Sequence, residues 1–229
     1  MYSKFRRLAR RLLGGRASVP EVHGVANAGW YDAVYRDSDS YAFPYWQSPY
    51  YFLWTVLADR IRTSRLRRVL DIGCGPGQLA SCLFDLAAIT EYTGIDFSTQ
   101  AIAMAKRVCP QGRFVVADAT ITSVHEEIPY DVVVCAEFLE HVPEDYDAIA
   151  RFRPGVRCLC TVPNFPYESH VRHFVSATQV IERYGPLFAS LDVWPLRGDD
   201  KRVYFVMDGV RNGNREALTA PRHAGLAVL

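Results

Sequence analysis

The chain has 229 residues, 49% of them hydrophobic and 22% charged, a composition typical of a soluble globular protein with one sizeable core. Its net charge is +1, but residues 1–20 carry six Lys or Arg and no acid, so the rest of the chain is negative by about five charges. This distribution argues against a broad basic surface for nucleic acid. The sequence also shows no internal repeat and no second domain.

The opening segment, residues 4–13, has the pattern of a basic amphipathic helix. Its apolar residues recur at helical spacing, and its arginines lie elsewhere around the helix. The segment lacks the continuous apolar core of a signal peptide, and no later stretch is long enough to span a bilayer. We therefore expect a cytoplasmic protein in which residues 4–13 are solvated, docked on the core or in weak contact with anionic lipid.

Aromatic residues are concentrated before the middle of the chain, where 11 of the 29 lie between Trp30 and Trp54. Ser48-Pro49 is a favourable helix start, and an apolar stripe follows it, so we expect a helix over residues 49–62 beside the first strand. The stripe consists of Leu53, Val56, Leu57 and Ile61. Two interpretations stay open for residues 31–46: packing on the core, or an aromatic lid that excludes water from a ligand site.

A glycine-rich turn follows the first predicted strand, Arg68–Ile72. Glycines at 73, 75 and 77 let the backbone bend sharply and let a ligand approach the main chain, and a helix is expected from Gln78 with Leu79, Leu83 and Leu86 on one face. The G-x-G-x-G spacing differs from the G-x-G-x-x-G of dinucleotide sites, and the preceding Asp71 would repel a diphosphate. The turn thus favours a cationic ligand, the alternative being an ordinary α/β turn without a cofactor.

Each of the next three predicted strands also leads into an acid. The strand Tyr92–Asp96 ends in Asp96, the strand Arg113–Ala117 is followed by Asp118, and the strand Tyr130–Ala136 is followed by Glu137. In α/β nucleotide sites, the acid that ends the second strand binds the ribose hydroxyls. The sequence therefore predicts a nucleoside-type ligand over the carboxyl ends of these strands.

The remaining elements continue the alternation of strands and helices that is typical of a doubly wound sheet. Helices are expected at Thr99–Val108, with Ile102, Ala105 and Lys106 in register, from Val142-Pro143-Glu144 onward and over Ser176–Gly185; strands are expected at Arg157–Val162, Leu187–Trp194 and Arg202–Met207. The six cysteines follow no zinc-binding spacing, and Cys135, Cys158 and Cys160 lie in strand patterns where buried thiols act as small hydrophobes. They favour a reducing compartment.

Taken together, the residues from about Trp46 to about Asp208 resemble a class I S-adenosylmethionine-dependent methyltransferase. The resemblance implies a Rossmann-like α/β fold, a doubly wound and mostly parallel seven-stranded sheet that closes with an antiparallel pair. It also implies that the glycine turn holds the methionine part of the cofactor, that Asp96 binds both ribose hydroxyls, and that Asp118 binds the adenine amino group with Phe97 on the adenine face. The expected cofactor contacts are Asp71, Gly73, Cys74, Gly75, Gly77, Asp96, Phe97, Asp118, Ala119 and Glu137.

Residues that act on the methyl acceptor should follow strands four and five. The candidates there are Glu140, His141, His170 and His173. In one interpretation a histidine is the general base for a hydroxyl acceptor. In a second, Glu137, Glu140, His141 and one later histidine bind Mg²⁺ or Mn²⁺, similar to the E-x-x-E-H arrangement of small-RNA 2′-O-methyltransferases. In a third, Glu140 and His141 are structural or shape the substrate site.

Many small-molecule methyltransferases resemble this chain in the same E-x-x-E-H-V, V-P-N and H-V-R-x-F sequences without a demonstrated metal, so we assign no metal ligand from the sequence. We expect a basic segment and aromatic lid over residues 1–45, an S-adenosylmethionine-binding domain over residues 46–210 and a flexible tail over residues 211–229. The expected reaction is methyl transfer to a small-molecule or glycan acceptor, at oxygen. A metal-dependent RNA 2′-O-methyltransferase and a non-catalytic S-adenosylmethionine-binding protein remain as alternatives.

Overall fold

The computed structural model describes residues 26–38 and 41–213. The basic segment over residues 4–13 lies outside this part of the chain, as does the expected tail from residue 214 onward. Among the helices of the described ranges, none combines the length and apolar character that a membrane crossing needs.

Seven strands form one sheet in the order β3-β2-β1-β4-β5-β7-β6. They are β1 (Arg68–Ile72), β2 (Glu91–Asp96), β3 (Arg113–Val116), β4 (Val132–Ala136), β5 (Arg157–Pro163), β6 (Phe188–Arg197) and β7 (Val203–Arg211). The first five strands pair in parallel, whereas β7 runs antiparallel to both β5 and β6. The expected doubly wound sheet with a closing antiparallel pair is thereby confirmed.

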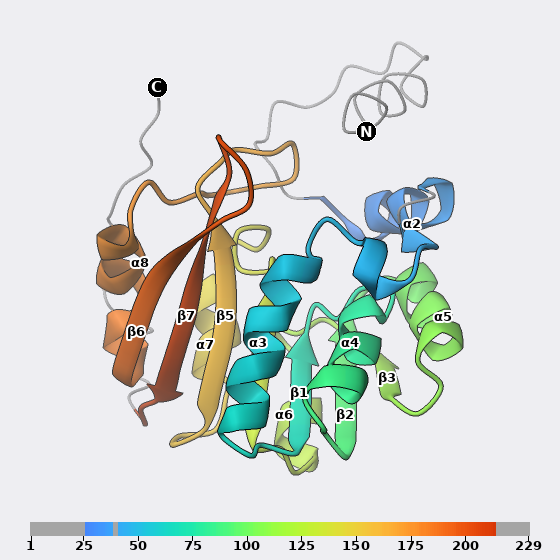
Figure 1. Ribbon diagram of the computed structural model, residues 1–229, viewed down its shortest axis with the longest axis horizontal. Helices are drawn as coiled ribbons and strands as arrows, with labels where there is room; N and C mark the ends of the chain where they lie inside the picture. The colour runs from blue at the N-terminus through green and yellow to red at the C-terminus, as the bar shows by residue number, and fades with distance from the viewer. Residues whose placement is uncertain (1–25, 39–40, 214–229) are drawn as a thin grey trace.

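Helices cover both faces of this sheet (Figure 1). They are α2 (Ala28–Asp37), α3 (Tyr51–Thr63), α4 (Gln78–Leu86), α5 (Thr99–Val108), α6 (Val124–Glu127), α7 (Asp145–Ala150) and α8 (Ala177–Tyr184), with 3₁₀ turns at Tyr45–Gln47 and Gly185–Leu187. Residues of α3, α4 and α5 share one buried cluster with the sheet, and residues of α7 and α8 share a second.

The strand β4 shows how a continuous apolar run fills both of these cores. Val132 and Val134 belong to the cluster on the α3–α4 side, whereas Val133 and Cys135 belong to the cluster on the α7–α8 side. Because successive side chains of a strand point to opposite faces, a strand covered on both sides must be apolar at every position. All six cysteines are buried and none forms a disulfide.

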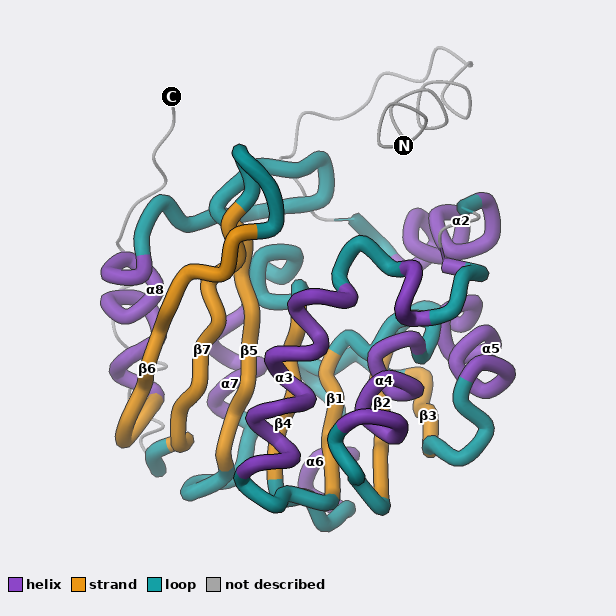
Figure 2. Tube along the Cα trace, in the orientation of Figure 1, coloured by secondary structure: helices purple, strands orange, loops and turns teal. Residues whose placement is uncertain are grey.

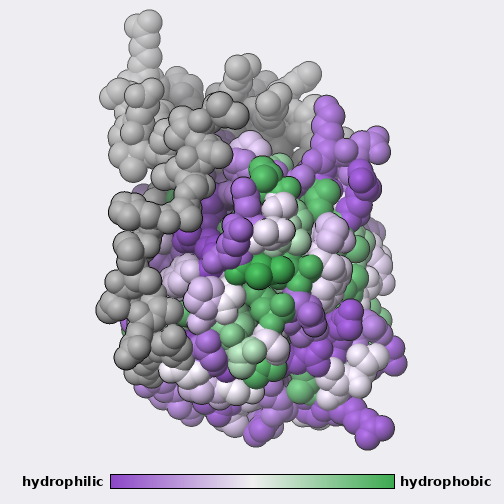
Figure 3. Space-filling model, turned by 90° about the vertical axis from the view of Figure 1, so that its left-hand side faces the viewer, coloured by the Kyte–Doolittle hydropathy of each residue, from purple (hydrophilic) through white to green (hydrophobic). Residues whose placement is uncertain are grey.

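The sheet ends at β6, and the surface beside it carries apolar side chains among polar ones (Figure 3). On the neighbouring helix α8, Ile181 remains 42% exposed. Pro195 lies within β6 and has no N–H to offer to a further strand, which suits a position at the edge of a sheet.

Two helices begin later than the sequence pattern predicts. The helix expected from Ser48-Pro49 begins at Tyr51, because the Ser48 hydroxyl accepts a hydrogen bond from the Tyr50 N–H at 3.2 Å and closes a turn ahead of the helix. The helix expected from Val142 begins at Asp145.

That second start is delayed because the main chain before it is bound by a side chain. Arg172 donates to the carbonyls of Val142 and Pro143 at 2.5 and 3.1 Å. The Val142 carbonyl is therefore used by a side chain where a helix would pair it with an N–H four residues later.

Three side chains expected on buried helix faces are more exposed than their spacing suggests. Val56 is half-buried, Lys106 is exposed, and Leu86, the last residue of α4, is 37% exposed. Conversely, Arg211, expected as the first residue of a flexible tail, is the last residue of β7 and is 2% exposed. Its guanidinium donates to the carbonyls of Ile149 and Leu187 at 3.1 and 2.9 Å.

Candidate active site

The carboxyl ends of the parallel strands open into a cavity of about 920 Å³, within the size range of ligand pockets. Loops lie above these strand ends (Figure 2), and side chains of α2 form part of the cavity wall. Every expected cofactor residue except Gly77 lines the cavity. Of the acceptor-side candidates, His141 and His170 line it, whereas Glu140 and His173 do not.

The three glycines of the turn all have positive φ, but their surroundings differ. A Cβ on Gly77 would lie 2.8 Å from the Cα of Ala105, and a Cβ on Gly73 would lie 2.6 Å from the ring of Phe138. These two glycines are required by packing. A Cβ on Gly75 would meet only the Tyr35 hydroxyl, at 3.4 Å, so Gly75 leaves its main chain accessible from the cavity.

Asp96 ties the end of β2 to this turn. Its Oδ2 accepts a hydrogen bond from the Gly75 N–H at 3.0 Å, and its Oδ1 accepts one from the Ser98 N–H at 2.8 Å. The side chain is 7% exposed, and burial raises the pKa of Asp96 to about 6. Each carboxylate oxygen keeps a second lone pair that a ligand can use.

Asp71 lies deeper, near the end of β1. It is 1% exposed, and its carboxyl accepts a hydrogen bond from the hydroxyl of Tyr92. Burial raises its pKa to about 7. A side chain so enclosed orders the base of the turn, and it adds negative charge to the cavity when it is ionised.

Asp118 differs from both of these acids because it is exposed. Its Oδ1 accepts hydrogen bonds from the N–H and the hydroxyl of Thr120, at 2.8 and 2.7 Å. Phe97 lines the cavity as well, and its ring centroid is 5.3 Å from that of Tyr31. An adenine-sized ring thus has aromatic neighbours and an acid at the same end of the cavity.

Helix α2 was not predicted from the sequence, and a side chain on it binds the start of α5. Asp32 accepts hydrogen bonds from the hydroxyls of Ser98 and Thr99 at 2.5 and 3.2 Å and from the Gln100 N–H at 3.2 Å. The hydrogen bond from Ser98 is the main cause of a lowered pKa at Asp32. This acid completes the N-terminus of α5 and holds α2 beside the cavity.

The aromatic lid expected over residues 31–46 divides in the structure. Tyr31, Tyr35 and Tyr41 line the cavity, whereas Trp46 is 58% exposed and lies outside its wall. Tyr31 reaches both ends of the site, because its ring also lies 6.0 Å, centroid to centroid, from the imidazole of His141. The part of the expected lid that lines the cavity therefore extends from Tyr31 to Phe43 and leaves out Tyr45 and Trp46.

Glu137 takes an unusual backbone conformation at the end of β4, with a φ of 55°. Its N–H donates to the Thr161 hydroxyl at 3.0 Å, and that hydroxyl donates to Glu137 Oε1 at 3.0 Å. Burial raises the pKa of Glu137 to about 8. Thr161 was not singled out in the sequence, because nothing in the sequence links it to a residue 24 positions away.

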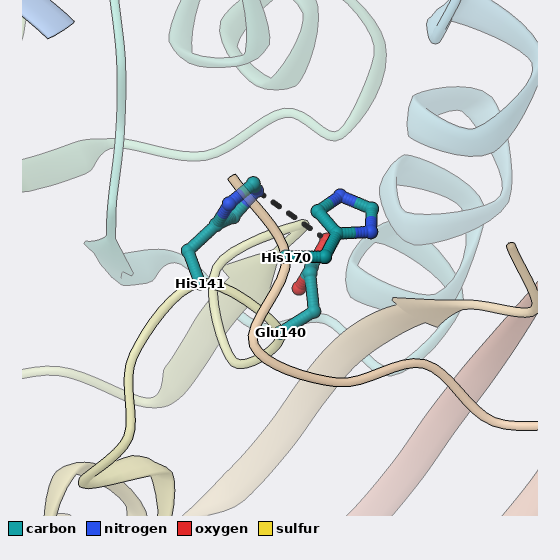
Figure 4. Close-up of side chains that lie close together, drawn as sticks. All are labelled: Glu140, His141 and His170. Carbon is teal, nitrogen blue, oxygen red and sulfur yellow. Dashed lines mark ion pairs between the residues drawn. The ribbon is translucent and has the colours of Figure 1, made fainter. Parts of the chain in front are cut away.

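Glu140, His141 and His170 meet at the other end of the cavity, where the Glu140 carboxylate is directed toward both imidazoles (Figure 4). One potential ligand atom from each residue lies within 4.8 Å of the others. The Nε2 of His141 is 3.7 Å from Glu140 Oε1, and the two imidazole centroids are 4.8 Å apart. Glu140 is fully buried, and neither of its oxygens has a hydrogen-bond partner among the described residues.

The hydrogen bonds of the two imidazoles determine their tautomers. His141 Nδ1 lies 3.1 Å from the Ser169 carbonyl, and His170 Nδ1 lies 3.1 Å from the Phe165 carbonyl. A carbonyl can only accept, so each Nδ1 carries the proton and each Nε2 has a free lone pair. Burial lowers the pKa of His141 to about 4 and that of His170 to about 3, so both rings are neutral at neutral pH.

His173 does not join this cluster. It is exposed and lies outside the cavity wall. Its neighbour Arg172 binds main-chain carbonyls, as described above, and forms an ion pair with Asp145 at 3.3 Å. This segment thus supplies one histidine to the cavity and uses an arginine to hold the loop after β4.

Residues 69–156 match a family model described as a methyltransferase domain. The ubiquinone biosynthesis O-methyltransferase of Burkholderia multivorans is 38% identical over 88 residues, which is 37% of each chain. The corresponding protein of Alkalilimnicola ehrlichii is 33% identical over 124 residues, or 51% of this chain and 49% of its own. The chain thus spans about half or less of the length of these curated relatives.

Solved structures share the fold at low sequence identity. The N-methyltransferase NodS of Bradyrhizobium japonicum, in complex with S-adenosyl-L-homocysteine, has a TM-score of 0.56 at 19% identity over 72% of this chain and 89% of its own. The methyltransferase domain of the bacterial protein CtHen1-C has a TM-score of 0.53 at 18% identity over 70% of this chain and 97% of its own.

Proposed function

We propose that the protein transfers a methyl group from S-adenosylmethionine to an oxygen of a small molecule. The match of residues 69–156 to a methyltransferase-domain model and the fold shared with a solved methyltransferase support this proposal. One observation carries the proposal. One end of a single cavity has Asp96, an acid placed to bind ribose hydroxyls, beside the accessible main chain of Gly75. The other end has the His141–His170 pair. A donor and an acceptor can therefore meet in one enclosed space.

The residues at the first end fit the proposed cofactor. Two oxygens of Asp96, each with a spare lone pair, suit two neighbouring ribose hydroxyls, and the exposed carboxylate of Asp118 suits an adenine amino group. The open main chain at Gly75 suits the amino-acid part of the cofactor. When bound, S-adenosylmethionine would supply a methyl group on a sulfonium, with the thioether of S-adenosylhomocysteine as the leaving group when an acceptor oxygen attacks the methyl carbon in line.

At the second end the chain has to hold an acceptor hydroxyl and let its proton leave. The new O–C bond forms as the C–S bond breaks, the electron pair of that bond goes to sulfur, and the hydroxyl proton passes to solvent. A histidine with a pKa of about 4 is a weak base at neutral pH. The imidazoles of His141 and His170 therefore suit orienting the hydroxyl through their Nε2 lone pairs better than taking its proton.

Aromatic side chains favour a phenolic acceptor over a glycan at this end. The cavity wall includes Phe165 and Tyr167, whose rings lie 5.9 and 5.6 Å from that of His170, centroid to centroid. Ring contacts continue from Phe165 through Tyr204 and Tyr50 to Trp54, which also line the cavity. Flat aromatic walls bind a flat ring through apolar contact and edge-to-face packing. The curated relatives are named as O-methyltransferases of ubiquinone biosynthesis, which agrees with a hydroxylated ring as acceptor.

A methyl-transfer screen tests this proposal. The full chain is incubated with S-adenosylmethionine and a panel of phenols, catechols and sugars, and the S-adenosylhomocysteine formed is quantified. We expect product with hydroxylated aromatic rings that is methylated at oxygen. Product with sugars alone would overturn the acceptor class, and a chain that binds neither S-adenosylmethionine nor S-adenosylhomocysteine would overturn the function.

A further inference from the structure

We propose that Glu140, His141 and His170 bind a divalent first-row transition-metal ion at the acceptor end of the cavity. The three residues are brought together by the loop after β4 and the loop after β5, and one ligand atom of each lies within 4.8 Å of the others. Binding of the ion stands on this geometry alone. Its part in methyl transfer rests on the proposed function.

The buried carboxylate of Glu140 is the first reason. It is fully buried, and both oxygens lack a hydrogen-bond partner among the described residues. A carboxyl group without a hydrogen-bond partner in a protein interior is unfavourable, and such groups are normally hydrogen-bonded, paired or bound to a metal. Arg172, the nearby cation, donates to main-chain carbonyls and pairs with Asp145. A metal cation would supply the partner that Glu140 lacks.

The orientation of the two imidazoles is the second reason. Each Nδ1–H is held by a main-chain carbonyl, of Ser169 for His141 and of Phe165 for His170. Metal-bound histidines donate their other ring N–H in this way, and the bond fixes the ring with the lone pair of the second nitrogen toward the ion. The rings are thus already held as Nε2 ligands.

The donor set indicates the class of metal. Two imidazole nitrogens and one carboxylate match zinc sites that keep an open position and the two-histidine, one-carboxylate sites of iron. Mg²⁺ prefers oxygen ligands and keeps several waters, so it fits less well. We therefore expect Zn²⁺, Co²⁺, Mn²⁺ or Fe²⁺ to bind more tightly than Mg²⁺.

The position of the cluster indicates what an open coordination site would face. His141 and His170 line the cavity, whereas Glu140 lies behind its wall. An ion held by all three would present its remaining positions to the cavity, where the acceptor hydroxyl is expected. The ion would then hold the hydroxyl in place of the Nε2 lone pairs and lower its pKa, so that the proton leaves to solvent more readily.

The experiment is a titration of the chelator-treated full chain with Co²⁺ and Zn²⁺, followed by visible absorption for Co²⁺ and by calorimetry for Zn²⁺. We expect one ion per chain and a Co²⁺ spectrum with nitrogen and oxygen ligands. Glu140→Gln and His170→Gln remove a direct ligand, so each should weaken binding by about 100-fold or more, since loss of an outer hydrogen-bond partner alone costs about 10–100-fold. His173→Gln, on the same loop, and Glu182→Gln, on α8, are the matched controls and should bind like the wild type.

Thermal unfolding separates a metal ligand from a structural side chain. Without metal, Glu140→Gln should be at least as stable as the wild type, because it removes an unpartnered buried carboxyl. With Zn²⁺, only the wild type and the controls should gain stability. The proposal would be overturned if the wild type bound neither ion, or if the variants bound like the wild type. It would also be overturned if metal-free Glu140→Gln unfolded at a lower temperature than the wild type and Zn²⁺ had no effect on the wild type.

Binding of S-adenosylhomocysteine to the same samples distinguishes this failure from failure of the proposed function. Cofactor binding without metal binding would overturn the metal site and leave the methyltransferase assignment in place. Metal binding without cofactor binding would support the metal site and overturn the proposed function.

Discussion

Replacing Asp96 by alanine tests the cofactor end of the cavity most sharply. Asp96 has two roles in the structure. Its carboxylate accepts hydrogen bonds from the Gly75 and Ser98 N–H groups, and its remaining lone pairs face the cavity. The substitution therefore removes the carboxylate that would accept hydrogen bonds from the ribose, and it also removes a hydrogen bond that stabilises the glycine turn.

The magnitude of the effect on binding follows from the hydrogen bonds lost. Bonds to a charged acceptor contribute about 1.5–3 kcal/mol, which corresponds to a Kd weakened by about 10- to 150-fold. The fold is weakened too, since each buried N–H left without its acceptor costs about 1–3 kcal/mol. Binding and stability must therefore be measured separately on the same variant.

Calorimetric titration with S-adenosylhomocysteine gives the Kd, at a temperature where circular dichroism shows the variant to be folded. Asp59→Ala is the control, because Asp59 is an exposed acid on α3 that pairs only at the surface with Arg62. A folded Asp96→Ala that binds S-adenosylhomocysteine as tightly as the wild type would refute the assignment of Asp96 to the ribose.

Further predictions concern the glycine turn, helix α2, and the pH dependence of stability and of S-adenosylhomocysteine binding. Alanine strains the backbone at both Gly75 and Gly77, which have positive φ, but only the Gly77 Cβ would lie 2.8 Å from Ala105 Cα. Gly77→Ala should therefore lower the unfolding temperature more than Gly75→Ala, and Gly75→Ala should weaken S-adenosylhomocysteine binding more than Gly77→Ala; equal effects of the two variants in both assays would contradict this division. Asp32→Ala removes the hydrogen bonds that hold α2 to α5, so stopped-flow measurements should show faster release of S-adenosylhomocysteine, and an unchanged rate would show that α2 does not retain the ligand. Because the pKa of Asp96 is raised from 3.8 to about 6, the folded chain binds this proton more readily than the unfolded chain. As pH falls through about 6 toward 3.8, the Asp96 contribution to stability should rise, while affinity for S-adenosylhomocysteine should fall because the carboxylate loses its charge. Affinity that is constant over this range would contradict an ionised Asp96 in the complex.

The parts of the fold that were predictable are those in which the signal is local. The helix Thr99–Val108 has the predicted bounds, and the structure adds that the Ser98 hydroxyl caps it by accepting a hydrogen bond from the Ala101 N–H. Strands buried on both faces leave long apolar runs, and acids at their ends mark where the runs stop. The carboxyl ends of parallel strands meet at one edge, so a linear pattern was enough to collect Asp96 and Asp118 in one cavity.

The parts that were missed depend on contacts between distant residues or on small energetic differences. Helix α2 has no buried residue and therefore no apolar period to detect, and its hold on α5 depends on Asp32, which is 66 positions from Ser98. The spacing of the acceptor-side histidines could not tell His170 from His173 either. Only the path of the loop turns one toward the cavity and leaves the other exposed.

The most direct test of the account is a crystal structure of the protein with S-adenosylhomocysteine. The account predicts the ribose hydroxyls on the Asp96 carboxylate, the adenine between Phe97 and Asp118, and the sulfur pointing toward His141 and His170. A nucleoside bound elsewhere, or a dinucleotide across the glycine turn, would contradict it.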